Sequence, residues 1–465
     1  MSFIRKCLLC ITDYCSNCTL AGLRYIVNHK LHITERLFWF ICFVLSVFGS
    51  YSLISEYQNN FESKAVSIVY ESLSPNNKIE FPTISVCDTY SDEHARKDIE
   101  EYVQKLGTDL SGEYNYDIEM LVSLIIYPTE HHEGLLRAKC TKYLECSECA
   151  QCPTKDYRKL AKRFTLKCSQ LFINCSLSNK PFDCCQYFLP LITPFGKCFL
   201  LNSGSESWLD TNMDQSNDEP LMEISIKRPI KVSILNKEDL PVKGIQKLSF
   251  VVLNTGEQKI IEIRIDNTVN DADVRTISPE YRKCRFTDEV LPNTEYKVYS
   301  FSACLADCIR IHQLRICNCT LYTFLPLEKE SIQECNFDGY LCLEKNSMVN
   351  PEPKSLMPWP NNKYTCDCLP SCTESDFNLI YESSSRTNYP RSFTIKIPKF
   401  PTEQFRRQAL RTQLDVVVTI GGILGLFLGA SILSGIEIIY HFLIRTFISY
   451  IYTRTVSEEI SVTII

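Results

Sequence analysis

The run Cys366-Asp367-Cys368-Leu369-Pro370-Ser371-Cys372 closes a ladder of cysteines from which the rest of this chain can be interpreted. The earlier members of the ladder are Cys284, Cys304, Cys308, Cys317, Cys319, Cys335 and Cys342. Their spacing is nearly palindromic, so two antiparallel helices stapled turn to opposite turn would pair them in nested order. Cross-links of this kind restrict the unfolded chain and typically add ~2–4 kcal/mol each to stability. The ladder therefore predicts a stiff, covalently braced region.

The distribution of the 25 cysteines predicts on which side of a membrane each part lies. Cys42 lies within the first apolar stretch, and four cysteines precede it: Cys7, Cys10, Cys15 and Cys18. The other twenty fall between Cys87 and Cys372, an even number in one segment, as expected where thiols are oxidised in pairs outside the cytosol. This segment is therefore predicted to be extracellular.

Two further groups of cysteines could form disulfides, bind zinc or be modified, and the sequence leaves these alternatives open. The cluster from Cys146 to Cys152 could bind zinc, but an oxidising compartment favours disulfides there. The N-terminal set from Cys7 to Cys18 could bind zinc or could be palmitoylated near the membrane, and we assign no role to it.

Two apolar stretches bracket the cysteine-rich segment. Residues 37–54 contain no charge and have about the minimum length for a membrane helix. Residues 416–444 carry one acid, Glu437. The first stretch starts far from Met1 and does not end in a cleavage site, so we interpret it as a retained span rather than a signal peptide. Bases precede it at Arg24, Lys30 and Arg36, which predicts a cytosolic N-terminus, and two spans return the C-terminus to the cytosol.

These features predict a membrane protein of five segments. They are a cytosolic N-terminal arm (1–36), a first transmembrane helix (37–54), an extracellular disulfide-rich domain (55–410), a second transmembrane helix (416–444) and a cytosolic C-terminal tail (445–465). Within the extracellular domain, alternating Val and Ile predict sheet over Lys227–Val252 and Gln258–Val269. Composition predicts helices over Asp98–Leu106 and Cys304–Ile316.

Composition and motifs also exclude several function classes. A formal net charge of -6 gives no sign of nucleic-acid binding. No Ser/His/Asp, metal or phosphate-loop signature is present, so we expect no enzyme activity, cofactor or bound metal. We interpret His32, His131 and His132 as surface residues rather than pH sensors. Asn174 and Asn318 begin glycosylation sequons, which agree with an extracellular location.

Small residues mark the second apolar stretch as a candidate pore. Gly421, Gly425 and Gly429 recur every four residues, a stripe that could simply allow close packing of membrane helices. Gly429-Ala430-Ser431 offers carbonyls and a hydroxyl without bulk, which suits helices that meet around a dehydrating ion. Glu437, about two turns further on, is an ionisable group of the kind that usually faces water or an ion path. Together these features predict a pore-lining second span.

The cysteine ladder resembles the thumb of acid-sensing channels, which belong to the degenerin and epithelial sodium channel family. That resemblance implies a trimer whose subunits carry an α+β extracellular domain with palm, finger and thumb regions. It also implies seven disulfides: Cys284–Cys372, Cys304–Cys368, Cys308–Cys366, Cys317–Cys342, Cys319–Cys335, Cys87–Cys198 and Cys168–Cys175. The pairing of Cys140, Cys146, Cys149, Cys152, Cys184 and Cys185 stays open.

The second apolar stretch is similar to the same family's second span. The resemblance places Gly429, Ala430 and Ser431 at the selectivity filter, and Val418 at the position where bulky residues hinder closure. It also places Ala21 where the family has the histidine of its cytosolic His-Gly gating element, with Gly22 as the glycine. The replacement of that histidine puts an ordinary open probability in doubt.

The resemblance as a whole is to insect pickpocket subunits, and it implies a function. The chain is expected to be a subunit of a sodium-permeable, amiloride-sensitive cation channel, with a sensory stimulus that is chemical, mechanical or osmotic. Its expected partners are sodium ions, membrane lipid and related subunits in a homo- or heterotrimer at the plasma membrane. Two alternatives stay open from the residues: an ATP-gated type of trimeric cation channel, and a non-conducting receptor or adhesion protein on two anchors.

Overall fold

The computed structural model describes residues 11–63, 65–73, 78–89, 101, 122–127, 155–202, 209–213, 220–245, 247–325, 332–349, 351–352, 356, 365–410, 413–445 and 448. The chain divides into two compact units. The helical unit comprises Met1–Ser67, Asp271–Arg282 and Gln408–Ile465, and the sheet unit comprises Ile68–Asn270 and Lys283–Arg407. Some predicted features lie outside the described residues: the helix over Asp98–Leu106 apart from Glu101, and His131, His132, Cys7, Cys10, Cys140, Cys146, Cys149 and Cys152.

A five-stranded antiparallel sheet in the order β11-β10-β3-β7-β6 forms one layer of the sheet unit. Its strands are β3 (Thr83–Asp88), β6 (Phe188–Thr193), β7 (Gly196–Leu201), β10 (Ile230–Leu235) and β11 (Ser249–Val252). Strand β3 is central and almost wholly buried, because its apolar side chains have neighbours on both sides and a core beneath them.

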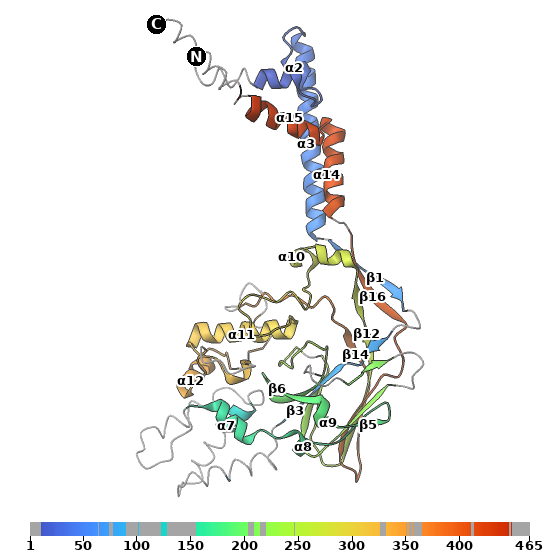
Figure 1. Ribbon diagram of the computed structural model, residues 1–465, viewed down its shortest axis with the longest axis vertical. Coiled ribbons are helices and arrows are strands. Elements are labelled where there is room, and N and C mark those ends of the chain that lie inside the picture. Colours follow the sequence, from blue (N-terminus) through green and yellow to red (C-terminus); the bar gives the residue numbers. More distant parts are fainter. Residues whose placement is uncertain are drawn as a thin grey trace. The chain divides into compact units, whose positions relative to one another are not determined.

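A six-stranded sheet in the order β14-β12-β15-β9-β4-β5 forms the other layer (Figure 1). Its strands are β4 (Phe172–Leu177), β5 (Lys180–Phe182), β9 (Leu221–Ile226), β12 (Glu257–Asp266), β14 (Asp376–Arg386) and β15 (Arg391–Lys396). Strands β12 and β15 are parallel and the other pairs are antiparallel. Met222 and Ile224 from this sheet share one core with Ile84 and Val86 from the first, so the sheets pack face to face. Strand β12 confirms the sheet predicted over Gln258–Val269, but Lys227–Val252 is sheet only at β10 and β11, since the described residues from 236 to 248 form turns and loop.

Two small sheets complete the unit. One has the order β1-β16-β13, with β1 (Val66–Ser72), β13 (Thr268–Asn270) and β16 (Glu403–Ala409), and the other pairs β2 (Ile79–Glu80) with β8 (Asn212–Met213). Gln404 and Arg406 on β16 donate to the Glu71 carboxylate on β1 at 3.0 and 2.8 Å. These hydrogen bonds, first that from Gln404, hold the pKa of Glu71 below its ordinary value.

We use the name thumb for α11 (Phe301–Cys317), η3 (Tyr322–Phe324), α12 (Phe337–Lys345) and the segment 365–372. Helix α11 confirms the helix predicted over Cys304–Ile316. It begins where the Ser300 hydroxyl accepts a hydrogen bond from the Ala303 N–H at 3.1 Å, and it ends at Asn318, whose φ of 55° is left-handed. Helix α12 needs a glycine at position 339, because a Cβ there would lie 2.5 Å from the Cys319 sulfur.

The thumb corrects the expectation of two antiparallel helices. Only Cys317 of α11 is bonded to a helical partner, Cys342 in α12, whereas Cys304 and Cys308 of α11 bond to an extended segment. Four residues of helix advance ~6 Å and two residues of extended chain ~6.6 Å. The spacing of four in one partner and two in the other is therefore itself the signature of a helix bonded to extended chain.

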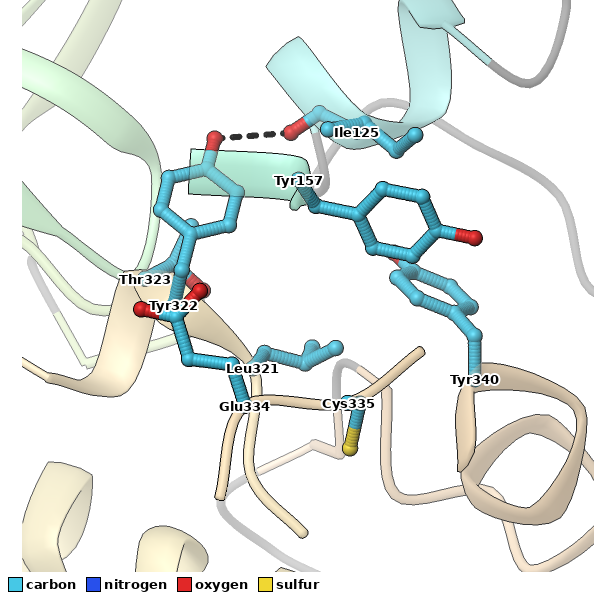
Figure 2. A pocket seen from close by; sticks show the side chains of 8 residues that line it. All are labelled: Ile125, Tyr157, Leu321, Tyr322, Thr323, Glu334, Cys335 and Tyr340. Atoms are coloured by element: carbon cyan, nitrogen blue, oxygen red, sulfur yellow. Dashed lines mark hydrogen bonds between the residues drawn. The ribbon is translucent and has the colours of Figure 1, made fainter. Parts of the chain in front are cut away.

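Buried tyrosines fill the core where α7 (Tyr157–Phe164) meets the thumb. Figure 2 shows Tyr157, Tyr322 and Tyr340 around a small pocket, with the Tyr322 hydroxyl donating to the carbonyl of Ile125 at 2.8 Å. Burial raises the pKa of all three hydroxyls, which therefore stay neutral. Beside them, the buried Arg158 pairs with Glu334 and donates to the Tyr322 carbonyl.

Eight disulfides join the described cysteines, and six of them are pairs that the family resemblance implies. Those six are Cys284–Cys372, Cys304–Cys368, Cys308–Cys366, Cys317–Cys342, Cys319–Cys335 and Cys87–Cys198. The last joins residues that lie directly opposite each other on β3 and β7.

The implied pair Cys168–Cys175 is wrong. Cys168 bonds to Cys185 and Cys175 bonds to Cys184. Cys168 begins the short helix α8 (Cys168–Leu171), Cys175 is buried on β4, and the adjacent cysteines open α9 (Cys184–Tyr187). Adjacent side chains in the first turn of a helix extend in different directions, so each of the two cysteines can reach a different partner.

The helical unit contains α2 (Leu23–Val27), α3 (Ile33–Ser63), α14 (Gln413–Leu428), α15 (Ile432–Ile439) and the π-helix η4 (Tyr440–Arg445). Helix α3 extends well beyond the apolar stretch 37–54, and its part Ile33–Asn59 is long and apolar enough to cross a membrane. The second apolar stretch is not one straight helix, because Leu414–Leu428 and Ile432–Arg445 are bent by 75° at a short break (Figure 1). Helices α3 and α14 pack closely at Gly49, where a Cβ would lie 2.9 Å from the Phe427 ring.

Candidate functional site

The candidate site is the interruption between α14 and α15, formed by Gly429, Ala430 and Ser431. Gly429 has a φ of 62°, a conformation that ends α14 and favours glycine. Ser431 starts α15 as its N-cap, with its hydroxyl accepting from the Ser434 N–H at 3.3 Å. The three residues that the sequence singled out as a filter are thus the three that interrupt the second apolar stretch.

The two half-helices give this interruption an electrostatic character. The carbonyl end of α14 and its aligned peptide dipoles carry partial negative charge, which attracts a cation. In membrane proteins, half-helix C-terminal ends and unwound carbonyls commonly coordinate sodium. The N-terminal end of α15 at Ser431 carries the opposite partial charge, so the oxygen ligands for a cation would come from the α14 side.

The segment that contains Ala21 and Gly22 lies against the interruption. The Ala21 N–H donates to the carbonyl of Leu428, the last residue of α14, at 3.0 Å. A Cβ on Gly429 would lie 3.5 Å from that of Ala21, an ordinary contact. Gly22 has a φ of 87°, which favours glycine, and it precedes α2. The backbone contact at position 21 does not depend on a histidine side chain.

Glu437 is bound by the same N-terminal segment. Its Oε2 accepts from the Thr19 N–H at 3.1 Å and from the Thr19 hydroxyl at 2.9 Å. The Thr19 hydroxyl also lies 2.8 Å from the Ser434 hydroxyl. This side-chain network joins residues far apart in sequence, and sequence reasoning missed Thr19 and Ser434. Their signal was weak: two hydroxyl residues within a few positions of motifs already noted.

A second contact joins the N-terminal segment to η4. Asp13 Oδ2 lies 3.0 Å from Arg445 Nη1 and 3.7 Å from His441 Nε2. The Tyr14 ring packs on His441 and Phe442, with centroids 5.6 and 5.4 Å away. Burial raises the pKa of the Tyr14 hydroxyl, which therefore stays neutral.

Among the described residues, Gly421 and Gly425 of the stripe pack against no other helix, whereas Gly429 lies against Ala21. Cβ atoms on Gly421 and Gly422 would meet nothing within 4 Å among the described residues, and one on Gly425 would meet only the Ala430 carbonyl at 3.7 Å. The close contact with α3 uses Gly49 instead. The surface of α14 that bears the stripe is therefore open for something other than α3.

Val418 and the two sequon asparagines lie on exposed surfaces, and Cys15 and Cys18 are partly buried. Val418 on α14 is 64% exposed. Asn174 and Asn318 are exposed, each followed by a cysteine in a disulfide. Cys15 and Cys18 are free thiols.

An apolar helix pair interrupted by small residues, in one chain with a disulfide-braced sheet domain, agrees with the expectation of an ion channel subunit. The chain belongs to the amiloride-sensitive sodium channel family, whose profile matches residues 14–441. This confirms the resemblance to degenerins and epithelial sodium channels. The members of this family are channels, not enzymes.

Individual relatives agree with this assignment. The chain is 21% identical to pickpocket protein 19 of Drosophila melanogaster, over 90% of this chain and 87% of that protein. It is 19% identical to the sodium channel protein Nach of the same species, over 93% of this chain and 86% of that protein. Similarity to human acid-sensing ion channel 2, at 24% identity, covers 54% of this chain and 53% of that protein.

Proposed function

We propose that this chain is a subunit of a sodium-permeable, amiloride-sensitive channel that opens in response to a sensory stimulus, whether chemical, mechanical or osmotic. The observation that carries the proposal is the interruption of the second apolar helix at Gly429–Ser431. An ion path needs exposed carbonyls without side-chain bulk at the narrowest point, and these three residues supply them. Related pickpocket and Nach proteins of flies support a channel of this type.

The channel is a homo- or heterotrimer with related subunits, in the plasma membrane. Helix α3 forms the first span, and the bent pair from α14 to η4 forms the second, pore-lining span. Both termini are cytosolic, and the sheet unit is extracellular, carrying glycans at Asn174 and Asn318. The open stripe of Gly421 and Gly425 supports this arrangement, since symmetry-related helices can approach closely there.

The N-terminal segment supports the filter in this proposal. Thr19 and Ala21 contact both half-helices, through Glu437 on α15 and Leu428 on α14. A displacement of either half-helix must break or remake these hydrogen bonds. The segment is therefore placed to influence opening.

Expression in oocytes tests the function. The chain is expressed alone and with a related subunit, and sodium current is recorded with and without amiloride. We expect an amiloride-sensitive inward sodium current in at least one combination. Absence of current in both, with surface labelling of the chain at normal levels, would favour a non-conducting receptor.

A further inference from the structure

Three thumb residues bring sulfur and imidazole atoms together. Cys308 and His312 lie one turn apart on α11, and Cys366 lies opposite them on the segment 365–372. A ring nitrogen of His312 and both sulfurs lie within 4.8 Å of one another. Within the described part of the chain, no other group of three or more His, Cys, Asp or Glu side chains has this spacing. In the oxidised protein the two sulfurs form a disulfide.

We propose that reduction of the Cys308–Cys366 disulfide by an external thiol or phosphine converts this group into a zinc site. The reductant supplies two electrons and the sulfur–sulfur bond breaks, leaving two thiols. A thiol reductant becomes a disulfide, and a phosphine becomes its oxide with oxygen from water. Zinc then displaces the two thiol protons and binds both thiolates and the imidazole.

The donor set suits this metal. Zinc prefers four ligands of sulfur and nitrogen, and two thiolates balance its charge. Cys308 is partly buried whereas His312 and Cys366 are buried, so a fourth ligand such as water would have to approach from the side of Cys308. The 3.2 Å contact of His312 Nε2 with the Thr365 carbonyl orients the ring toward the segment that carries Cys366.

Other restraints keep the two thiols together after reduction. The Cys372 N–H donates to the Arg285 carbonyl at 2.9 Å, a hydrogen bond that does not depend on a disulfide. The Tyr299 hydroxyl donates to the Leu369 carbonyl at 2.6 Å, and the Arg285 N–H donates to the Pro370 carbonyl at 2.9 Å. Because these hydrogen bonds remain when the disulfides are reduced, Cys366 stays close to α11 rather than on a released loop.

The neighbouring bridge supplies an internal control. Cys304 and Cys368 have the same helix-to-extended geometry and lie in the same ladder. They belong to no such ligand group among the described residues. Zinc should therefore distinguish two otherwise matched pairs of thiols.

Differential alkylation of the full-length protein in detergent tests the proposal. The protein is reduced with a phosphine and treated with iodoacetamide with and without zinc chloride, and the labelled peptides are quantified by mass spectrometry. We expect zinc to slow alkylation of Cys308 and Cys366 at least about tenfold and to leave Cys304 and Cys368 unprotected. His312→Ala should lose the protection, and His312→Cys, which restores a ligand atom, should regain it.

Three results would overturn the proposal. They are equal alkylation of Cys308 and Cys366 with and without zinc, equal protection of Cys304 and Cys368, and full protection in His312→Ala. Circular dichroism before reduction establishes that each variant is folded. The result does not depend on ion conduction, so it stands apart from the test of the channel function.

Discussion

The thumb and the interrupted helix are restrained by different kinds of bond. Five disulfides lie in the thumb and in the segments next to it, from Cys284–Cys372 at one end to Cys319–Cys335 at the other. The interruption at Gly429 is held by hydrogen bonds, such as that from Ala21 to Leu428 at 3.0 Å and that from Thr19 to Glu437 at 2.9 Å. Disulfides are covalent cross-links that restrict the chain, whereas hydrogen bonds can exchange partners. The difference indicates a rigid thumb and an interruption whose contacts can be rearranged more easily.

The largest predicted change is the loss of stability when a disulfide of the ladder is removed. This loss tests whether the disulfides of the ladder act as a unit. Cys284 and Cys372 are 88 residues apart in sequence, and the Cys304–Cys368 disulfide lies inside the loop that they close. With that inner bond intact, the outer bond closes a loop of only roughly 24 residues, so its loss should cost ~3.5 kcal/mol rather than ~4.6 kcal/mol.

Chemical unfolding of the Cys284→Ser/Cys372→Ser variant, followed by circular dichroism, measures this cost. The single bridge variant Cys319→Ser/Cys335→Ser is the control, since its bonded residues are 16 apart and its loss should cost ~3 kcal/mol. A far larger loss for the outer bond than for this control would contradict a nested ladder.

A second prediction concerns Gly429, the pivot of the interruption. Gly429→Ala places a Cβ at a φ of 62°, which should cost ~1–2 kcal/mol and reduce amiloride-sensitive current roughly 5- to 30-fold. Gly421→Ala is the matched control, because its Cβ would meet nothing within 4 Å among the described residues. Current per surface subunit is the measurement, and similar losses in both variants would remove the special role of Gly429.

A smaller effect is expected at Thr19, which tests whether the N-terminal segment restrains the second half-helix. Thr19→Val removes the hydroxyl but keeps the hydrogen bond from the N–H to Glu437. The contact should therefore lose ~1 kcal/mol of stabilisation, which corresponds to about a fivefold change in open probability. Thr19→Ser should restore the parent value. Single-channel recording provides the measurement, and a Thr19→Val channel that opens like its parent would show that the contact is incidental.

The smallest effect is expected at Val418. This residue is 64% exposed on α14, so removing it leaves no cavity within the chain. We expect Val418→Gly to leave the resting amiloride-sensitive current unchanged, because neighbouring helices adapt to a side chain of this size. A fall in resting current, at equal surface expression, would instead mean that Val418 biases the parent toward opening.

Sequence reasoning predicted the parts of the fold that depend on local pattern. The strands of the Val- and Ile-rich segments and helix α11 follow from periodicity, and the ladder pairs followed from the family resemblance. The bonding of Cys175 to Cys184 instead of Cys168 could not be predicted, because four cysteines in a short segment allow three connectivities.

The site was predicted in part for a similar reason. Gly429-Ala430-Ser431 stood out by composition, but the 75° bend and the positive φ at Gly429 depend on contacts made after folding. Thr19 reaches Glu437 across 418 positions of sequence, and nothing in the local pattern indicates such a pairing. Long-range polar contacts are the part of the site that a single sequence does not reveal.

The most direct test of the central claim is the sodium-to-potassium permeability ratio of channels altered at Ser431. Ser431→Thr adds a methyl group and keeps the hydroxyl that caps α15, whereas Ser431→Ala removes the cap and adds no volume. If the interruption is the filter, reversal potentials should show lower selectivity for Ser431→Thr and still lower selectivity for Ser431→Leu, with Ser431→Ala close to the parent. Unchanged selectivity in all three variants, with normal current, would contradict the account and place the filter elsewhere.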